Sequence, residues 1–263
     1  MINDNYLINS ETNRIEFLDN RFYRDTRTGA MVPSVTTLLE AWPKGAQYYE
    51  WLKKNGENAD AIRDEAGRRG SVVHNLTESL DLGNEVQLCE PDGSPRYKMS
   101  EWAMLERYVD FRRTIKPTVI EVETNLISSE LGYAGTLDRI LSINGDLWLV
   151  DIKTSAAVYD HYDLQLVAYW NLWRTLNKVP DHEALKMRLG ILWLNAKTKT
   201  YGKGEAIQGP GWQLVEASDS KERLNDLWGA CRKMWHAVNA NTKPRELSYA
   251  LSHKIEQLET VNP

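Results

Sequence analysis

The chain has 263 residues, a formal net charge of −5 and only two cysteines. Its length fits one elaborated domain or two small ones, and no apolar run is long enough to predict a signal peptide or a membrane span. Cys89 and Cys231 provide no disulfide framework, which fits a reducing compartment. We therefore expect a cytoplasmic protein without a membrane partner.

The N-terminal part predicts additions ahead of a larger core. Residues 1–58 contain a predicted hairpin that turns at 25–29 and a helix capped by Ser34. A helix over 59–82 carries His74, and another helix begins at Ser100, its expected N-cap, and ends before Pro117. Residues 1–58 should pack on a core over 59–240, and 241–263 should form a C-terminal tail.

The remaining pattern predicts an alternation of strands and helices. Periodicity indicates three strands, a helix, two strands and a last helix, over 118–127, 133–143, 147–154, 159–176, 187–195, 212–216 and 219–239. Asn144-Gly145 is a strong hairpin signal, because both residues accept positive φ. The order predicts an α/β fold with a mixed central sheet that is flanked by helices. An antiparallel three-stranded meander would come first, followed by a helix and a further strand of the sheet.

Two aspartates and a lysine in the meander are the best candidates for chemistry. Asp151 and Lys153 are two positions apart in a predicted strand, so their side chains share a face. Asp138 and Asp151 each stand six residues from the turn, so antiparallel pairing brings them together. A carboxylate-held divalent cation neutralises phosphate oxygens and makes water nucleophilic near pH 7. Two solvated strand acids are the alternative, but an unpaired charge in such apolar segments would be costly.

The Asp-x-Lys spacing alone is weak, because it arises by chance about once in a chain of this length. Asp219-Ser220-Lys221 has the same spacing. It opens a predicted helix, so its side chains diverge and helix capping explains it.

Flanking segments offer further candidates. Glu121 and Glu123 are expected on one face of the strand 118–127, with Glu123 the better further ligand and a solvated strand face the alternative. Gln165 and Tyr169 are one helical turn apart and suit contact with a phosphate or an ordered water. By its own chemistry, His74 fits a hydrogen-bonded helical histidine better than a ligand.

The net charge counts against a DNA-binding protein, because phosphate neutralisation supplies most non-specific affinity. Basic residues nevertheless cluster locally, and Arg68 and Arg69 precede His74 by one to two helical turns. They could line the path of a DNA strand, although solvated surface is the alternative. Trp102, outside the expected core, is a candidate for stacking on a base.

The candidate residues occur along the chain in the order His74, Asp138, Asp151-x-Lys153 and Gln165-x-x-x-Tyr169. This ordered set resembles the motifs of the PD-(D/E)XK nuclease superfamily, in particular of its RecB-like branch, which includes phage-encoded exonucleases. The resemblance covers about residues 74–194, and 21–25 and 32–39 are similar to what phage members carry ahead of the core. It implies a restriction-endonuclease-like core. Members with an iron–sulfur cluster are poor models, because this chain lacks the four cysteines that such a cluster needs.

The resemblance also implies roles. One or two Mg²⁺ or Mn²⁺ ions would be held by His74, Asp138, Asp151 and the backbone carbonyl of Ile152. An oxygen-rich site with one imidazole suits these ions. The catalytic set would be Lys153 with Asp138, Asp151, Gln165 and Tyr169.

The implied activity is hydrolysis of DNA, by an exonuclease acting on single-stranded or duplex ends in phage or bacterial recombination, repair or replication. A recombinase or a single-strand-binding protein would be a partner, and the bacterial host cytoplasm the location if the protein is phage-encoded. One alternative is a structure-specific or restriction-type endonuclease with the same site. Another is a non-catalytic DNA- or partner-binding protein on a degenerate nuclease fold.

Overall fold

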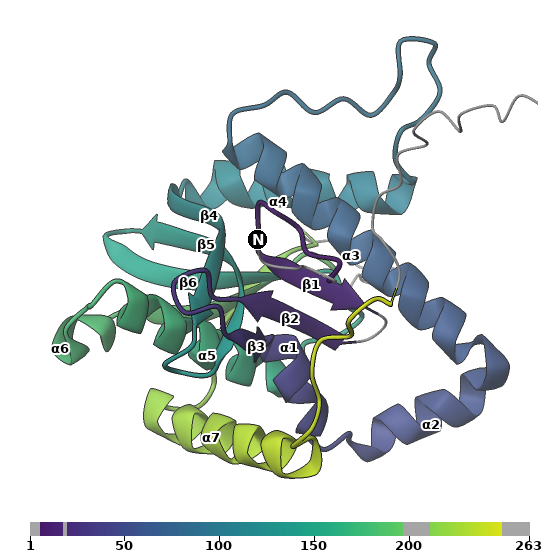
Figure 1. The fold of residues 1–263 in the computed structure, drawn as a ribbon. Helices are drawn as coiled ribbons and strands as arrows, with labels where there is room; N and C mark the ends of the chain where they lie inside the picture. Colours follow the sequence, from purple (N-terminus) through teal and green to yellow (C-terminus); the bar gives the residue numbers. More distant parts are fainter. Residues whose placement is uncertain (1–5, 18–19, 197–210, 249–263) are drawn as a thin grey trace, which may run out of the picture.

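A five-stranded mixed sheet forms the centre of the computed structural model, which describes residues 6–17, 20–196 and 211–248 (Figure 1). Its strands lie in the order β4-β5-β6-β7-β8, with bounds Thr118–Ser128, Tyr133–Ile143, Asp146–Lys153, Arg188–Trp193 and Gln213–Glu216. Strands β6 and β7 pair in parallel, and the other neighbours pair antiparallel. The predicted mixed α/β fold with its three-stranded meander is confirmed.

Helices cover both faces of this sheet (Figure 1). The helices α3 (Ala59–Asp81) and α4 (Met99–Ile115) cover one face, where Val73 and Phe111 pack with Val150 of β6. The helices α5 (His161–Leu176) and α7 (Lys221–Val238) cover the other face, where Leu149 of β6 belongs to their apolar cluster. Side chains therefore alternate between two buried layers along β6, as the strand period requires.

A small antiparallel sheet precedes the core, with strands β1 (Arg14–Phe17), β2 (Asn20–Arg24) and β3 (Met31–Pro33). It confirms the predicted hairpin, and Ser34 bridges to Ala134 of β5. Ser34 also caps α1 (Val35–Leu38), because its Oγ accepts from the Thr37 amide at 2.9 Å. The remaining elements are short or exposed: η1 (Leu39–Ala41), α2 (Ala46–Asn55), η2 (Gly56–Asn58) and α6 (Asp181–Ala184).

Two helix starts differ from the prediction. Helix α4 begins at Met99 with Lys98 as its N-cap, because the Glu101 carboxylate accepts from the Lys98 amide at 2.8 Å. Helix α7 begins at Lys221, because Ser220 is its N-cap and accepts from the Arg223 amide. Residues 249–263 of the predicted tail lie outside the described residues. None of the helices in the described ranges is long and apolar enough to cross a lipid bilayer.

The sheet opens at one point, which positions the site. Asn144 and Gly145 have φ of 52° and 91°, and they close the predicted hairpin between β5 and β6. The two strands pair only from that turn to Arg139 and Val150. Beyond this pair, β5 continues alongside β4 while β6 continues alongside β7. We call this opening, flanked by Asp138 and Asp151, the fork.

Candidate functional site

The backbone of Ile152 faces the fork, where its usual β-ladder partner is missing. Its N–H donates to Oδ2 of Asp138 at 2.6 Å, and its carbonyl lies 3.0 Å from Nε2 of His74. A carbonyl only accepts, so Nε2 must carry the proton and donate. Two side chains thus replace the ladder hydrogen bonds, which fixes the Asp138 carboxylate and the His74 ring in space.

Three potential ligands converge beside this backbone. His74, Glu123 and Asp138 each offer one ligand atom, and these atoms all lie within 4.8 Å of one another. Nδ1 of His74 lies 3.5 Å from Oδ1 of Asp138 and 3.6 Å from Oε1 of Glu123. An imidazole that turns one nitrogen to a carboxylate cluster, and donates from the other to a backbone carbonyl, is typical of a metal-ligating histidine.

Asp151 lies on the Lys153 side of the fork, and among the described residues it is not part of that three-residue group. Its Oδ2 is 2.7 Å from the Lys153 ammonium, so the two side chains share a face of β6. The ammonium also donates to Oε1 of Gln165 at 2.9 Å, and Gln165 donates to the Tyr169 hydroxyl at 3.0 Å. The structure therefore brings the predicted Asp-x-Lys and Gln/Tyr pairs into one chain of contacts.

Burial and neighbouring charges shift the pKa values of three residues at the fork. Burial raises the pKa of Asp151 to about 6, against the opposing effect of Lys153. For His74, burial favours the neutral ring, but Asp138 and Glu123 outweigh it and raise its pKa to about 10. Burial likewise opposes the Lys153 charge, yet Asp151 and Asp138 raise its pKa. With a pKa of about 10, His74 is an imidazolium at neutral pH, paired with the carboxylates of Asp138 and Glu123.

This protonation predicts how the affinity for metal depends on pH. A cation bound to Nδ1 must displace the proton held by His74, whose pKa is about 10, so affinity should rise with pH between about 6.5 and 9, by up to about tenfold per unit. Below about pH 6, Asp151 binds a second competing proton. Calorimetry with Mn²⁺ in buffers of different ionisation enthalpy should detect the release of about one proton per ion near pH 8. A pH-independent affinity over this range would contradict the displacement of that proton.

The two glutamates of β4 do not share a face, contrary to the prediction. Oε1 of Glu121 accepts from the Trp173 indole of α5 at 2.8 Å, whereas Glu123 points to His74 of α3. Glu123 has φ of 44°, in the left-handed region, and this local reversal interrupts the strand alternation. A residue with this backbone conformation cannot be identified from strand spacing.

Gly135 of β5 packs against the Tyr169 ring. A Cβ at this position would lie 2.5 Å from Cε1 of Tyr169, so either the ring or the strand would have to move. We expect Gly135→Ala to lower the free energy of unfolding by about 1–3 kcal/mol through overpacking, measured in urea.

Gly229 in α7 provides the matched control, because a Cβ at this position would have nothing within 4 Å of it. Gly229→Ala should leave the stability equal or raise it, since alanine favours a helix by about 0.5–1 kcal/mol. Equal stability of the two variants would show that the Gly135 contact is not tight.

The predicted DNA-contacting residues have different surroundings. The Arg68 guanidinium is held by the carboxylates of Glu65 and Glu101, which join α3 to α4. Arg69 lies nearer the fork, where its Nη2 donates to the Thr154 carbonyl at 3.4 Å. Trp102 is partly buried and stacks on Tyr97, with ring centroids 6.3 Å apart.

Sequence reasoning missed three residues beside the fork. Arg139 is completely buried and donates to Glu123 at 3.1 Å. Tyr162 is the second of these residues, and the centroid of its ring lies 4.7 Å from the Lys153 ammonium. Glu78 has its pKa raised by burial and by the charge of Glu123. Glu78 could have been found, because it follows His74 by four residues and therefore lies on the same face of α3.

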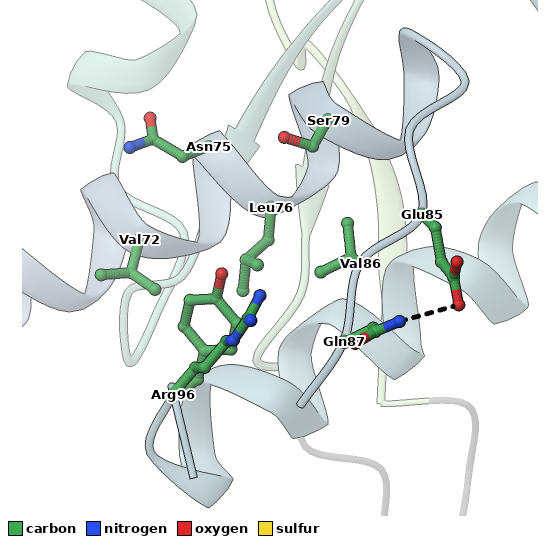
Figure 2. Close-up of a pocket in the computed structure, with 9 residues that line it drawn as sticks. Val72, Asn75, Leu76, Ser79, Glu85, Val86, Gln87 and Arg96 are labelled. Carbon is green, nitrogen blue, oxygen red and sulfur yellow. Dashed lines mark hydrogen bonds between the residues drawn. The ribbon is translucent and has the colours of Figure 1, made fainter. Parts of the chain in front are cut away.

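A pocket of about 230 Å³ lies beside α3 (Figure 2). It is lined by α3 and by the segment 84–98, through Val72, Asn75, Leu76, Ser79, Glu85, Val86, Gln87, Arg96 and Tyr97. At 3.6 residues per turn, its α3 residues lie roughly 100–200° around the helix from His74. This pocket is therefore separate from the fork.

The donors at the fork fit a hard divalent cation. They comprise carboxylate oxygens and one imidazole nitrogen, a set that suits Mg²⁺ or Mn²⁺ better than a structural zinc, which takes several thiolates or imidazoles. Two of the candidate ligand side chains, His74 and Asp138, are oriented by contacts with Ile152.

Comparison with known proteins agrees with this chemistry. A search of curated proteins finds no match to the chain. Residues 37–246 match the PD-(D/E)XK nuclease superfamily, a stretch that contains the five-stranded sheet and all residues of the fork. The chain therefore belongs to the PD-(D/E)XK nuclease superfamily.

Proposed function

We propose that this protein is a divalent-metal-dependent exonuclease that hydrolyses phosphodiester bonds at DNA ends. The observation that carries the hydrolytic function is the position of Lys153. Its ammonium lies 2.7 Å from Asp151 and 2.9 Å from Gln165, next to the His74, Glu123 and Asp138 group. A carboxylate group that can hold a cation and a fixed amine thus meet at one edge of the sheet.

Mg²⁺ or Mn²⁺ would be held by the side chains of His74, Glu123 and Asp138, with Asp151 and the Ile152 carbonyl as the other nearby donors. When bound, such an ion neutralises charge on the phosphate and lowers the pKa of water. The orientation of the ligands comes from the chain itself, because Asp138 and His74 are both tied to the backbone of Ile152.

Lys153 acts as a charged donor. Its raised pKa keeps it an ammonium at neutral pH, so it orients water or binds a phosphate oxygen rather than accepting a proton. Gln165 accepts a hydrogen bond from the ammonium and donates one to the Tyr169 hydroxyl, so this pair holds the ammonium in place.

DNA would approach along the side of the fork where α3 presents Arg69. The Arg69 guanidinium contacts the carbonyl of Thr154, one residue after Lys153. It can therefore reach a phosphate of a DNA strand that is bound at the fork. Arg68 would contribute positive charge, although its carboxylate partners reduce it. Trp102 would stack on a base farther along α4.

The order of the motifs supports an exonuclease, because it resembles the RecB-like and phage exonuclease branch. We place its action in recombination, repair or replication of phage or bacterial DNA, in the cytoplasm of the cell. A recombinase or a single-strand-binding protein would be its partner. All expected positions are filled and meet at the fork, which favours an active enzyme over a degenerate fold.

End-labelled linear DNA and covalently closed circular DNA, each with Mg²⁺ or Mn²⁺, test this proposal. The wild type should degrade linear DNA from its ends, leave closed circles intact and lose activity with a chelator. Nicking of circles would instead assign an endonuclease. A wild type that cleaves neither substrate would assign a non-catalytic DNA-binding protein.

A further inference from the structure

We propose that Arg139 is a positioning residue. It holds the three segments that carry the candidate metal ligands in a fixed arrangement: α3 with His74, β4 with Glu123 and β5 with Asp138. This inference rests on the metal site of the proposed function. Arg139 follows Asp138 on β5, and its side chain is completely buried between β4, β5 and α3. Its guanidinium donates to protein groups, so it would act through the candidate ligands.

One nitrogen of Arg139 joins two of the three segments. Nη1 donates to Oε1 of Glu123 at 3.1 Å and to the backbone carbonyl of Asp138 at 2.7 Å. The same Oε1 of Glu123 faces Nδ1 of His74. The guanidinium therefore fixes the carboxylate oxygen that a cation would bind.

The other end of the guanidinium reaches the third segment. Nη2 donates to the hydroxyl of Thr77 at 3.1 Å, and that hydroxyl donates to the backbone carbonyl of His74 at 2.9 Å. Nε donates to Asp81 at 2.6 Å, near the end of α3. Asp81 also binds Arg112 and Tyr108 of α4, so the whole arrangement is anchored in the helical layer.

The backbone of Glu123 explains why such an anchor is needed. Its φ of 44° is in the left-handed region, a conformation that costs a non-glycine residue free energy and persists only where neighbouring contacts hold it. This conformation turns Glu123 away from the face used by Glu121. The ion pair with the buried Arg139 guanidinium is one contact that holds the Glu123 carboxylate in this position.

Arginine is the residue type that this position requires. Its planar guanidinium carries five fixed donors and stays charged when buried, whereas a lysine is a flexible point charge that cannot reach the same partners together. Arg139→Lys should therefore preserve the charge but lose the simultaneous contacts with Glu123, Asp138 and Thr77.

A double-mutant cycle on Mn²⁺ affinity tests this role, using Arg139→Lys, Glu123→Gln and the double variant, with calorimetry as the readout. Each single variant should bind Mn²⁺ about 10–100-fold more weakly. The double variant should bind more weakly than either single variant, but by less than the sum of the two free-energy losses, because Arg139 acts partly through Glu123 and partly through Asp138 and His74. Arg232→Lys is the matched control. Arg232 is partly buried, donates to the Leu131 carbonyl and lies over the Tyr133 ring, so the affinity of this variant for Mn²⁺ should equal that of wild type.

Several outcomes would overturn the inference. Wild-type affinity in Arg139→Lys, or fully additive losses in the double variant, would show that Arg139 does not act through Glu123. If Arg139→Lys fails to fold, Thr77→Val tests the inference instead, because it removes only the hydroxyl that links Arg139 to His74. An unchanged affinity of this variant for Mn²⁺ would contradict the inference. A wild type that binds no Mn²⁺ would instead remove the metal site itself, and with it the proposed function.

Discussion

Lys153→Ala should lower the rate of DNA cleavage by about 10²–10⁴-fold, the range expected for losing one positioned acid–base or charge-stabilising group. The ammonium of Lys153 is held by Asp151 and Gln165, and no other described amine lies in this chain of contacts. Single-turnover cleavage of linear DNA with saturating Mg²⁺ is the measurement. The affinity for Mn²⁺ should change much less than the rate, because Lys153 is a cation and not a ligand.

Lys221→Ala provides a control from the same chain. Lys221 occupies the second Asp-x-Lys spacing, but it lies at the start of α7 and donates to the Leu185 carbonyl. This variant should cleave DNA at the wild-type rate. If Lys153→Ala retained full activity while Lys221→Ala lost it, the assignment of the candidate catalytic lysine would be wrong.

Asp138→Asn should abolish both metal binding and cleavage. The two oxygens of Asp138 have separate roles: Oδ2 accepts from the Ile152 amide at 2.6 Å, and Oδ1 faces the His74 ring at 3.5 Å. An asparagine has one oxygen and one amide nitrogen, so it can fulfil only one of these roles. We expect Mn²⁺ affinity to fall at least about 100-fold and cleavage to fall by about 10³-fold or more.

The metal-free form of this variant gives a second readout. The Asp138 charge is the principal interaction that raises the pKa of His74 to about 10. In Asp138→Asn this pKa should fall, and NMR titration of the ring measures the change. Asp163→Asn is the control, since Asp163 also accepts from a backbone amide, that of Ser218, but lies away from the fork. A His74 pKa and a Mn²⁺ affinity that both stay at wild-type values in Asp138→Asn would refute the arrangement described.

The distribution of charge at the fork explains why these variants should have large effects. Asp138 and Glu123 face His74, Glu123 also pairs with Arg139, and Asp151 pairs with Lys153. Removing one member of a buried charge group leaves its partner uncompensated, which is more costly than removing an exposed charge. Each change should therefore alter the protonation of its neighbours as well as its own contacts.

Short spacings in the sequence were enough to predict several contacts at the site. The two-residue period of a strand placed Asp151 and Lys153 on one face, and Asn144-Gly145 required the hairpin that brings Asp138 towards Asp151. The four-residue spacing of Gln165 and Tyr169 likewise allowed their mutual hydrogen bond in α5. These relations are local, so backbone geometry alone fixes them.

Which distant groups meet at the fork depends on how the layers of the fold pack together. The separation of β5 from β6 exposes the Ile152 backbone to Asp138 and His74, and strand periodicity does not record where two strands part. The left-handed conformation of Glu123 and the buried contacts of Arg139 depend on packing against α3. Such contacts join residues far apart in the chain, and their geometry follows from how the layers pack rather than from any spacing in the sequence.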